Sequence, residues 1–182
     1  MKITKIAQFT VVAVALMFAL PGRAETMSVP TAENTAFTLE VPSGWKPKGD
    51  AKDESVEATS ADEHAYLSAW MVVTSDPKAE EQYIKDLSAT LKDSLKSIDD
   101  ASKQEPFEAN GATGVVVKGS GIDKRAGTKV KFRVVLFPAG KDQVGIVYTD
   151  YDADAPQDTM TVLEGILKSI KVAAPKKEPG GK

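Results

Sequence analysis

The stretch Thr128-Lys-Val-Lys-Phe-Arg-Val-Val-Leu-Phe137 alternates between apolar and polar side chains along most of its length. Successive side chains of a β-strand point to opposite faces, so this pattern predicts a strand with one buried face. A short turn over 138–142 follows, and the alternation resumes over 143–149. Two strands joined by a short turn predict an antiparallel hairpin. The residues expected to be buried are Val130, Phe132, Val134 and Leu136 on the first strand and Val144, Ile146 and Tyr148 on the second.

Upstream of this hairpin, the apolar pattern changes its period. Residues 65–74 are apolar on both faces, which predicts a strand that is covered on both sides. After Ser75-Asp76-Pro77, apolar residues follow at helical spacing as far as Ile98, which predicts an amphipathic helix that ends near residues 99–100. A second helix is expected to close the chain, with Met160, Leu163, Ile166, Leu167 and Ile170 on its apolar face.

Four shorter stretches complete the expected set of strands. They cover residues 36–41, 55–59, 104–109 and 112–120. Asn110-Gly111, between the last two, is a strong hairpin signal. The order of strands and helices, with hairpin connections, predicts an α+β domain: an antiparallel β-sheet of about six or seven strands with two main helices packed on it.

The first 24 residues have the features of a secretory signal peptide. Lys2 and Lys5 precede an apolar run over 6–20, and small residues lead to a cut between Ala24 and Glu25. The run is too short to span about 30 Å of hydrocarbon comfortably, so cleavage is expected rather than a retained membrane anchor. The protein is therefore expected to be exported, to the periplasm or alternatively to the medium. The absence of cysteine excludes disulfides and a lipid anchor on cysteine.

The chain after the expected cut has 158 residues (182 minus 24), which suits one domain without disulfides. Residues 25–35 are polar and contain proline, so a flexible arm is expected there. A single α+β domain is expected over 36–172, followed by a disordered tail over 173–182, which is rich in Pro, Lys and Gly.

The charge of the chain bears on its partners. The net charge is −3, and removing the three cations of the leader, Lys2, Lys5 and Arg23, makes it −6. Nucleic acids and anionic membranes both require clustered cations, so neither is expected as the main partner. The oligomeric state stays open.

One segment resembles a known family. Phe37-Thr-Leu-Glu-Val-Pro-Ser-Gly-Trp45 is similar to the entry strand of the PsbP-like superfamily, which includes DcrB-like exported bacterial proteins. The later order of a long helix, a glycine-punctuated meander and a final helix ending at Lys171 agrees with it. The resemblance implies a sheet with helices on both faces and, usually, no catalysis. It implies no binding residue, because the matching positions are core and turn positions.

Several motifs suggest chemistry only weakly, so neither a catalytic residue nor a metal or other cofactor is expected. His64 is the one histidine, and a metal site usually needs two or more His or Cys ligands. Asp150, Asp152 and Asp154 open a calcium-loop pattern that lacks the required Gly and Glu, so a polar turn whose last Asp caps the closing helix is expected. Gly119-Ser120-Gly121 lacks the nucleophile elbow, so its glycines are expected at turn or bulge positions.

A basic run offers a possible partner surface. Lys129, Lys131 and Arg133 would share one face of their strand, and Lys124 and Arg125 lie in the preceding turn. This run could dock an acidic partner, although such runs are more often solvated faces. Trp45 and Trp70 could stack on a ligand, but core packing is the commoner role.

Three functions follow from these observations. The first is a non-enzymatic exported protein that binds an envelope protein in assembly or maintenance. The second is a module that binds a small ligand or a lipid in a cleft between the sheet and the helix Tyr83–Ile98. The third is a hydrolase with an unrecognised site, which would require a pocket that gathers His64 with acids.

Overall fold

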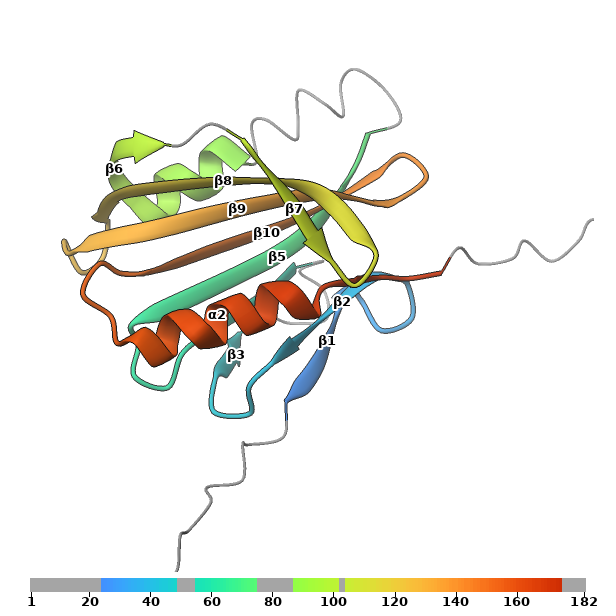
Figure 1. The fold of residues 1–182 in the computed structure, drawn as a ribbon, viewed down its shortest axis with the longest axis horizontal. Coiled ribbons are helices and arrows are strands. Elements are labelled where there is room, and N and C mark those ends of the chain that lie inside the picture. Colours follow the sequence, from blue (N-terminus) through green and yellow to red (C-terminus); the bar gives the residue numbers. More distant parts are fainter. Residues whose placement is uncertain (1–23, 49–54, 75–86, 102–103, 175–182) are drawn as a thin grey trace, which may run out of the picture.

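The computed structural model describes residues 24–48, 55–74, 87–101 and 104–174. Its main sheet is antiparallel and has eight strands, in the order β3-β4-β5-β10-β9-β8-β6, with β7 also paired to β8 (Figure 1). The predicted α+β sheet with two helices is confirmed. The strands are β3 (Lys46–Lys48), β4 (Ser55–Thr59), β5 (Ala65–Val73), β6 (Leu95–Ala101), β7 (Glu105–Ala109), β8 (Ala112–Asp123), β9 (Lys129–Gly140) and β10 (Gln143–Asp152).

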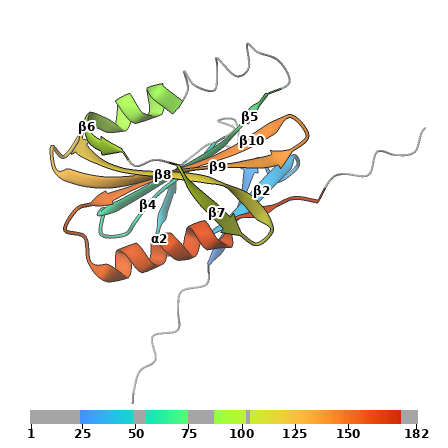
Figure 2. The same cartoon turned by 45° about the horizontal axis from the view of Figure 1, so that its top comes forward.

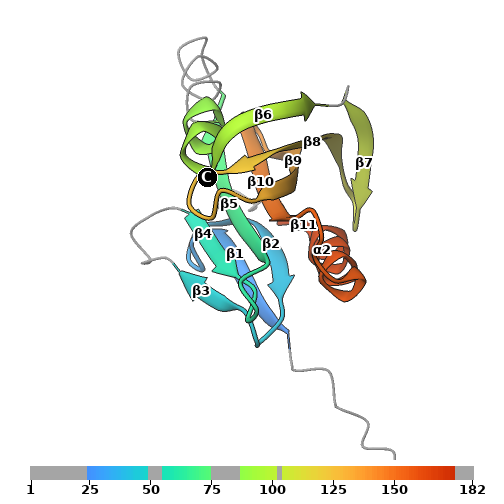
Figure 3. The same ribbon diagram turned by 90° about the vertical axis from the view of Figure 1, so that its left-hand side faces the viewer.

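A second, three-stranded sheet lies beside the main one, in the order β1-β2-β11 (Figure 3). It consists of β1 (Glu25–Pro30), β2 (Thr35–Val41) and β11 (Lys171–Val172), so it joins the two ends of the domain. The expectation of a flexible arm over 25–35 is therefore wrong for residues 25–30. These residues pair with β2 along their whole length, and Val29 is fully buried.

The main sheet is covered on both faces, as Figure 2 shows. One face packs against α2 (Gln157–Ser169) and the small sheet, through a cluster that includes Phe37, Val135, Phe137 and Leu163. The other face packs against helical residues 87–94, through a cluster that includes Val130, Phe132, Ile146 and Tyr148. The expected burial of β5 on both sides is confirmed. The alternation along β9 holds as far as Val134, but beyond it Val135 and Phe137 are also buried, so this part of the strand is covered on both faces.

The turns follow the sequence signals closely. Asn110 and Gly111 have φ values of 42° and 85° and connect Ala109 to Ala112 of the β7–β8 hairpin. Two positive φ values are what the tightest hairpin turn requires, and Asn and Gly accept them at the lowest steric cost. The turn Pro42–Trp45 is closed by a hydrogen bond from the Trp45 N–H to the Pro42 carbonyl (2.9 Å), and Trp45 is buried.

The first helix ends earlier than its apolar spacing predicts. The helix stops at Ser94, and residues 95–101 form β6 at the edge of the main sheet. Leu95, the first residue of this strand, is buried, whereas Ile98 is 49% exposed. The expected helix start over 75–86 lies outside the described residues, as do the signal peptide and residues 175–182 of the expected tail.

Close approach of β6 explains two glycines of β8. A Cβ atom at Gly121 would meet the Ser97 carbonyl oxygen, and one at Gly119 would meet the Phe132 ring and the Asp100 carbonyl oxygen. These glycines lie within a strand, which runs to Asp123, rather than in a turn. The bulges of this pairing lie on β6, between Leu95 and Ser97 and between Ile98 and Asp100.

Candidate functional site

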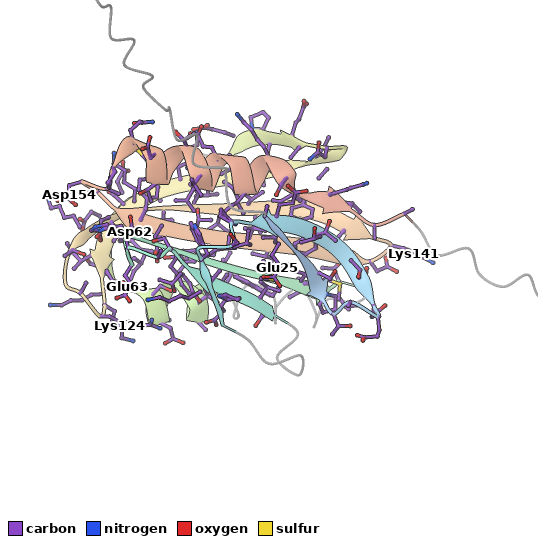
Figure 4. The ribbon with its side chains drawn as sticks, turned by 90° about the horizontal axis from the view of Figure 1, so that it is seen from below. Glu25, Asp62, Glu63, Lys124, Lys141 and Asp154 are labelled. Atoms are coloured by element: carbon purple, nitrogen blue, oxygen red, sulfur yellow. The ribbon has the colours of Figure 1, made fainter. Side chains whose placement is uncertain are left out.

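A polar pocket lies at one end of the main sheet, where the last turn of helical residues 87–94 meets the β8–β9 turn. Its cavity volume is about 270 Å³. Figure 4 shows that Asp62, Glu63, Asp154 and Lys124 gather at this end of the molecule, whereas Lys141 lies at the opposite end. The residues that line the pocket are Thr59, Glu63, His64, Ala65, Tyr66, Ser94, Asp123, Arg125, Ala126, Val130, Asp150 and Asp152.

Asp150 is the buried acid of this pocket. It lies in β10, opposite Tyr66 of β5 and Phe132 of β9, and is only 8% exposed. Its Oδ2 accepts a hydrogen bond of 2.8 Å from the Tyr148 hydroxyl, and among the described residues no donor bonds to its Oδ1. Burial raises the pKa of Asp150 to about 6, although the bond from Tyr148 and the charge of Arg125 oppose this rise.

Two tyrosines surround this carboxyl group. Burial, with the adjacent Asp150 charge, raises the pKa of Tyr148 far above its ordinary value, so its phenol stays protonated and donates to Asp150. Burial raises the pKa of Tyr66 to about 12, so the Tyr66 phenol is also neutral at any physiological pH. Their ring centroids are 6.3 Å apart, so the two rings are neighbours on the same sheet face.

His64 and Asp152 form a second polar pair at the rim. The distance between His64 Nδ1 and Asp152 Oδ2 is 2.7 Å, and the Thr128 hydroxyl donates to the other carboxylate oxygen at 3.1 Å. This hydrogen bond to Asp152 raises the pKa of His64. The expected solvated position of His64 in the turn before β5 is confirmed, and its ring is in addition held by a carboxylate from another strand.

The pocket thus brings His64 together with acidic side chains, which is the arrangement that a hydrolase would require. A His–Asp pair is two thirds of a nucleophilic triad, in which the other ring nitrogen faces a nucleophile. Among the described residues, however, no serine or threonine hydroxyl is hydrogen-bonded to His64. Ser120 lies in the pairing of β8 with β6 and does not line the pocket.

The calcium-loop interpretation of Asp150, Asp152 and Asp154 can also be compared with the structure. Asp150 and Asp152 belong to β10, whose extended backbone differs from a cation-binding loop. In the described part of the chain, no group of three His, Cys, Asp or Glu residues could hold a metal ion. The expected cap by Asp154 is wrong, since Pro156 occupies the N-cap of α2 without a side-chain hydrogen bond.

The predicted basic run does not form one free surface. Lys129 and Lys131 are exposed, but Arg133 lies under α2, 3.4 Å from Glu164 and 6.0 Å from the Tyr151 ring centroid. Lys124 turns toward the other helix, where it approaches Asp93 at 3.8 Å and donates to the Lys92 carbonyl. Arg125 alone of the five lines the pocket.

Comparison with known proteins gives a fold. Neither a family model nor a curated protein matches the sequence. Among solved structures, LpqN, involved in cell envelope biogenesis of Mycobacterium tuberculosis, has a TM-score of 0.50 and 15% identity over 86% of this chain and 88% of its own. Cyanobacterial PsbP (CyanoP) from Synechocystis sp. PCC 6803 has a TM-score of 0.50 and 12% identity over 86% and 96%.

The chain has the PsbP-like fold. A protein from Bacteroides thetaiotaomicron is also similar, with a TM-score of 0.54 and 11% identity over 87% of this chain; the match spans about half (51%) of that protein. At identities this low, the structural similarity establishes the PsbP-like fold and nothing finer. The resemblance of the Phe37–Trp45 segment to the PsbP-like entry strand is confirmed at the level of the fold, with Trp45 in its core.

Sequence reasoning missed the central residue of the pocket. Asp150 was placed in the turn after the last strand, whereas β10 continues to Asp152. The alternation Val144, Ile146, Tyr148 extends by one step to Asp150, so a carboxyl group on a buried face could have been noticed. The meeting of Tyr66 with Asp150 depends on strand pairing between distant segments, for which the sequence carries no local signal.

Proposed function

We propose that this protein is a non-enzymatic, exported ligand-binding protein of the bacterial cell envelope. The pocket beside Asp150 supports the binding role, because a buried carboxyl group with one unbonded oxygen lines a cavity. The pocket borders the end of helical residues 87–94 through Ser94 rather than running along that helix, where the sequence had suggested a cleft. The fold shared with LpqN, a protein of cell envelope biogenesis, and the leader sequence support the envelope as its place of action.

The arrangement of the pocket supports binding over catalysis. The Tyr148 phenol is committed to Asp150, and His64 is committed to Asp152. A hydrolytic site would need an activated nucleophile within hydrogen-bond reach of such a base. Groups that bond to one another and leave one acceptor toward the cavity suit the recognition of a ligand.

Binding can be tested by narrowing the pocket. Ala126 lines the cavity and is exposed, so Ala126→Trp should obstruct it without disturbing the core. Ala153→Trp is a matched control, because Ala153 is exposed nearby but does not line the cavity. Native mass spectrometry of each protein after incubation with a small-molecule envelope extract should show a bound species with wild type and Ala153→Trp only. Equal occupancy in Ala126→Trp would contradict this site.

Export predicts a defined mature N-terminus. Cleavage after Ala24 would leave Glu25, the first residue of β1, which pairs with Val41. Intact-mass analysis of protein recovered from the periplasm should therefore give a chain that begins at Glu25. Retention of residues 1–24 in the exported protein would refute the localisation.

Docking of an acidic protein partner is a second candidate function, favoured by the exposure of Lys129 and Lys131 beside Arg125. The double change Lys129→Glu/Lys131→Glu should alter stability by no more than about 0.5 kcal/mol, because exposed side chains contribute little. It should weaken partner capture at low salt, where steering charges are least screened.

The pair Lys141→Glu/Lys171→Glu makes the same charge change at exposed positions elsewhere. Capture should be measured for all three proteins at low and moderate salt. Equal capture by both double variants would show that the β9 lysines are a solvated face.

A further inference from the structure

We propose that the pocket beside Asp150 binds a small molecule through a primary ammonium group, which donates to the free oxygen of Asp150. This inference rests on the proposed ligand-binding function and names the chemistry of the ligand. It is argued from the bonding of Asp150, the charges that line the cavity, and the ring of Tyr66.

One carboxylate oxygen of Asp150 can accept a hydrogen bond from a cationic donor. Tyr148 occupies Oδ2 at 2.8 Å, whereas Oδ1 receives no hydrogen bond from the described residues. The structure also gives no ion pair between Asp150 and a cation of the described residues. An ionised carboxylate that is removed from water is stabilised most by a cation that also donates hydrogen bonds, and an ammonium group does both.

The other acids of the cavity already have partners. Glu63 bonds to Lys46 at 2.9 Å, and Asp152 lies 2.7 Å from His64. Asp123 accepts hydrogen bonds from the backbone N–H groups of its own turn, at Arg125 and Ala126. An incoming cation would therefore be directed to Asp150.

The net charge of the lining selects against anions. Four carboxyl groups line the cavity, on Glu63, Asp123, Asp150 and Asp152, against the guanidinium of Arg125 and the imidazole of His64. Such a pocket attracts cations and repels carboxylates and phosphates.

The size and the walls of the pocket fit a small amine. A cavity of about 270 Å³ lies just below the usual range for drug-sized ligands, so a ligand of few atoms is expected. Tyr66 is half-buried and lines the cavity, so an ammonium beside Asp150 would also lie near an aromatic ring, which attracts cations.

Binding of an amine should strengthen as the pH rises. The titratable and charged groups that face Asp150 are Tyr148 and Asp152 of its own strand, Tyr66 of β5, and Asp123 and Arg125 of the β8–β9 turn. Both tyrosines stay neutral, so the groups that titrate in this range are Asp150, whose pKa is about 6, and His64 at the rim, whose protonated ring would repel an ammonium at low pH. An ammonium ion prefers the ionised carboxylate, so affinity should rise between pH 5 and pH 7.5.

The test is an NMR titration of the mature protein with 1,4-diaminobutane, sorbitol and acetate as probes. The diamine should shift resonances of residues around the pocket, whereas sorbitol and acetate should not. Asp150→Asn should weaken diamine binding by about tenfold or more, since a charged hydrogen bond is lost. Asp154→Asn removes the same charge from an exposed neighbour that does not line the cavity, and should change binding less than about threefold.

A second arm separates free amines from lysine side chains of a partner. A blocked lysine derivative, N-acetyl-lysine methylamide, carries the same ammonium on a bulkier body, and weaker binding than that of the diamine supports a small free ligand. Tighter binding of the lysine derivative than of the diamine would contradict a small free ligand. It would indicate that the pocket binds a lysine side chain of a partner protein.

Other outcomes overturn the amine inference in distinguishable ways. If sorbitol or acetate binds and Asp150→Asn abolishes it, the pocket binds a ligand of another class and the ligand-binding function stands. If Asp150→Asn and Asp154→Asn weaken diamine binding equally, the diamine responds only to the net charge of the protein and makes no specific contact with Asp150. If no probe shifts the resonances of pocket residues at pH 5 or at pH 7.5, the amine inference fails. The Ala126→Trp variant then tests the ligand-binding function separately.

Discussion

Replacing Trp45 by alanine is expected to lower the free energy of unfolding by about 3–5 kcal/mol. Trp45 is only 8% exposed and belongs to the cluster that joins the small sheet to the main one. Its loss removes the transfer energy of a large side chain and leaves a cavity between the turn Pro42–Trp45 and the core. The measurement is the denaturant midpoint and slope of the mature protein at fixed pH.

Val73→Ala is the control for this change. Val73 is 47% exposed, so its truncation should alter stability by no more than about 0.5 kcal/mol. A Trp45→Ala midpoint equal to that of wild type would mean that Trp45 does not support the core, and would favour its role as a ligand-stacking residue.

Asp150→Asn is expected to stabilise the protein at neutral and alkaline pH. The pKa of Asp150 is raised to about 6 in the folded protein from a reference of 3.8, so the folded state binds more protons than the unfolded state within this window. Stability contributed by the protonated carboxyl group is therefore lost as pH rises from about 4 to 6. Above this range, the buried charge costs on the order of 3 kcal/mol, and asparagine avoids that cost while still accepting from Tyr148.

This prediction is checked by denaturant unfolding of wild type, Asp150→Asn and Asp154→Asn at pH 4.5 and pH 8. The Asp150→Asn variant should exceed wild type at pH 8 and differ little at pH 4.5, whereas the exposed Asp154→Asn change should leave the pH profile unaltered. His64 contributes in a different window, because its raised pKa gives stability that is full below about 6.5 and lost as pH rises further. A destabilised Asp150→Asn at both pH values would contradict the assignment of a buried charge.

Together, the two predictions separate the core of the fold from its candidate site. Trp45 should stabilise the protein at every pH, since it acts through burial. Asp150 should destabilise it where it is ionised, which is typical of a residue retained for binding rather than for folding. A ligand that supplies a cation would offset that cost, so amine binding should raise the melting temperature of wild type more at pH 8 than at pH 5.

Local patterns in the sequence determined the element types and the fold class. Alternation along 128–137 predicted β9 and the burial of Val130, Phe132 and Val134. Asn110-Gly111 predicted the β7–β8 turn, because both signals act over a few residues. The apolar stretch at 65–74 predicted a strand covered on both sides, which holds for β5. The turn before Trp45 and its burial also follow from adjacent residues.

Only the tertiary structure decided the features that depend on distant segments. Residues 95–101 have helical apolar spacing, yet they form β6, because Gly119 and Gly121 let their backbone approach β8 closely. Residues 25–30 form a strand because they pair with the edge of β2 that β11 does not occupy. The pocket exists because strand pairing places Tyr66 beside Asp150, 84 residues later, and brings Asp152 to His64. Hydrogen bonding between strands is set by long-range register, and no local periodicity in the sequence encodes which distant side chains that register will bring together.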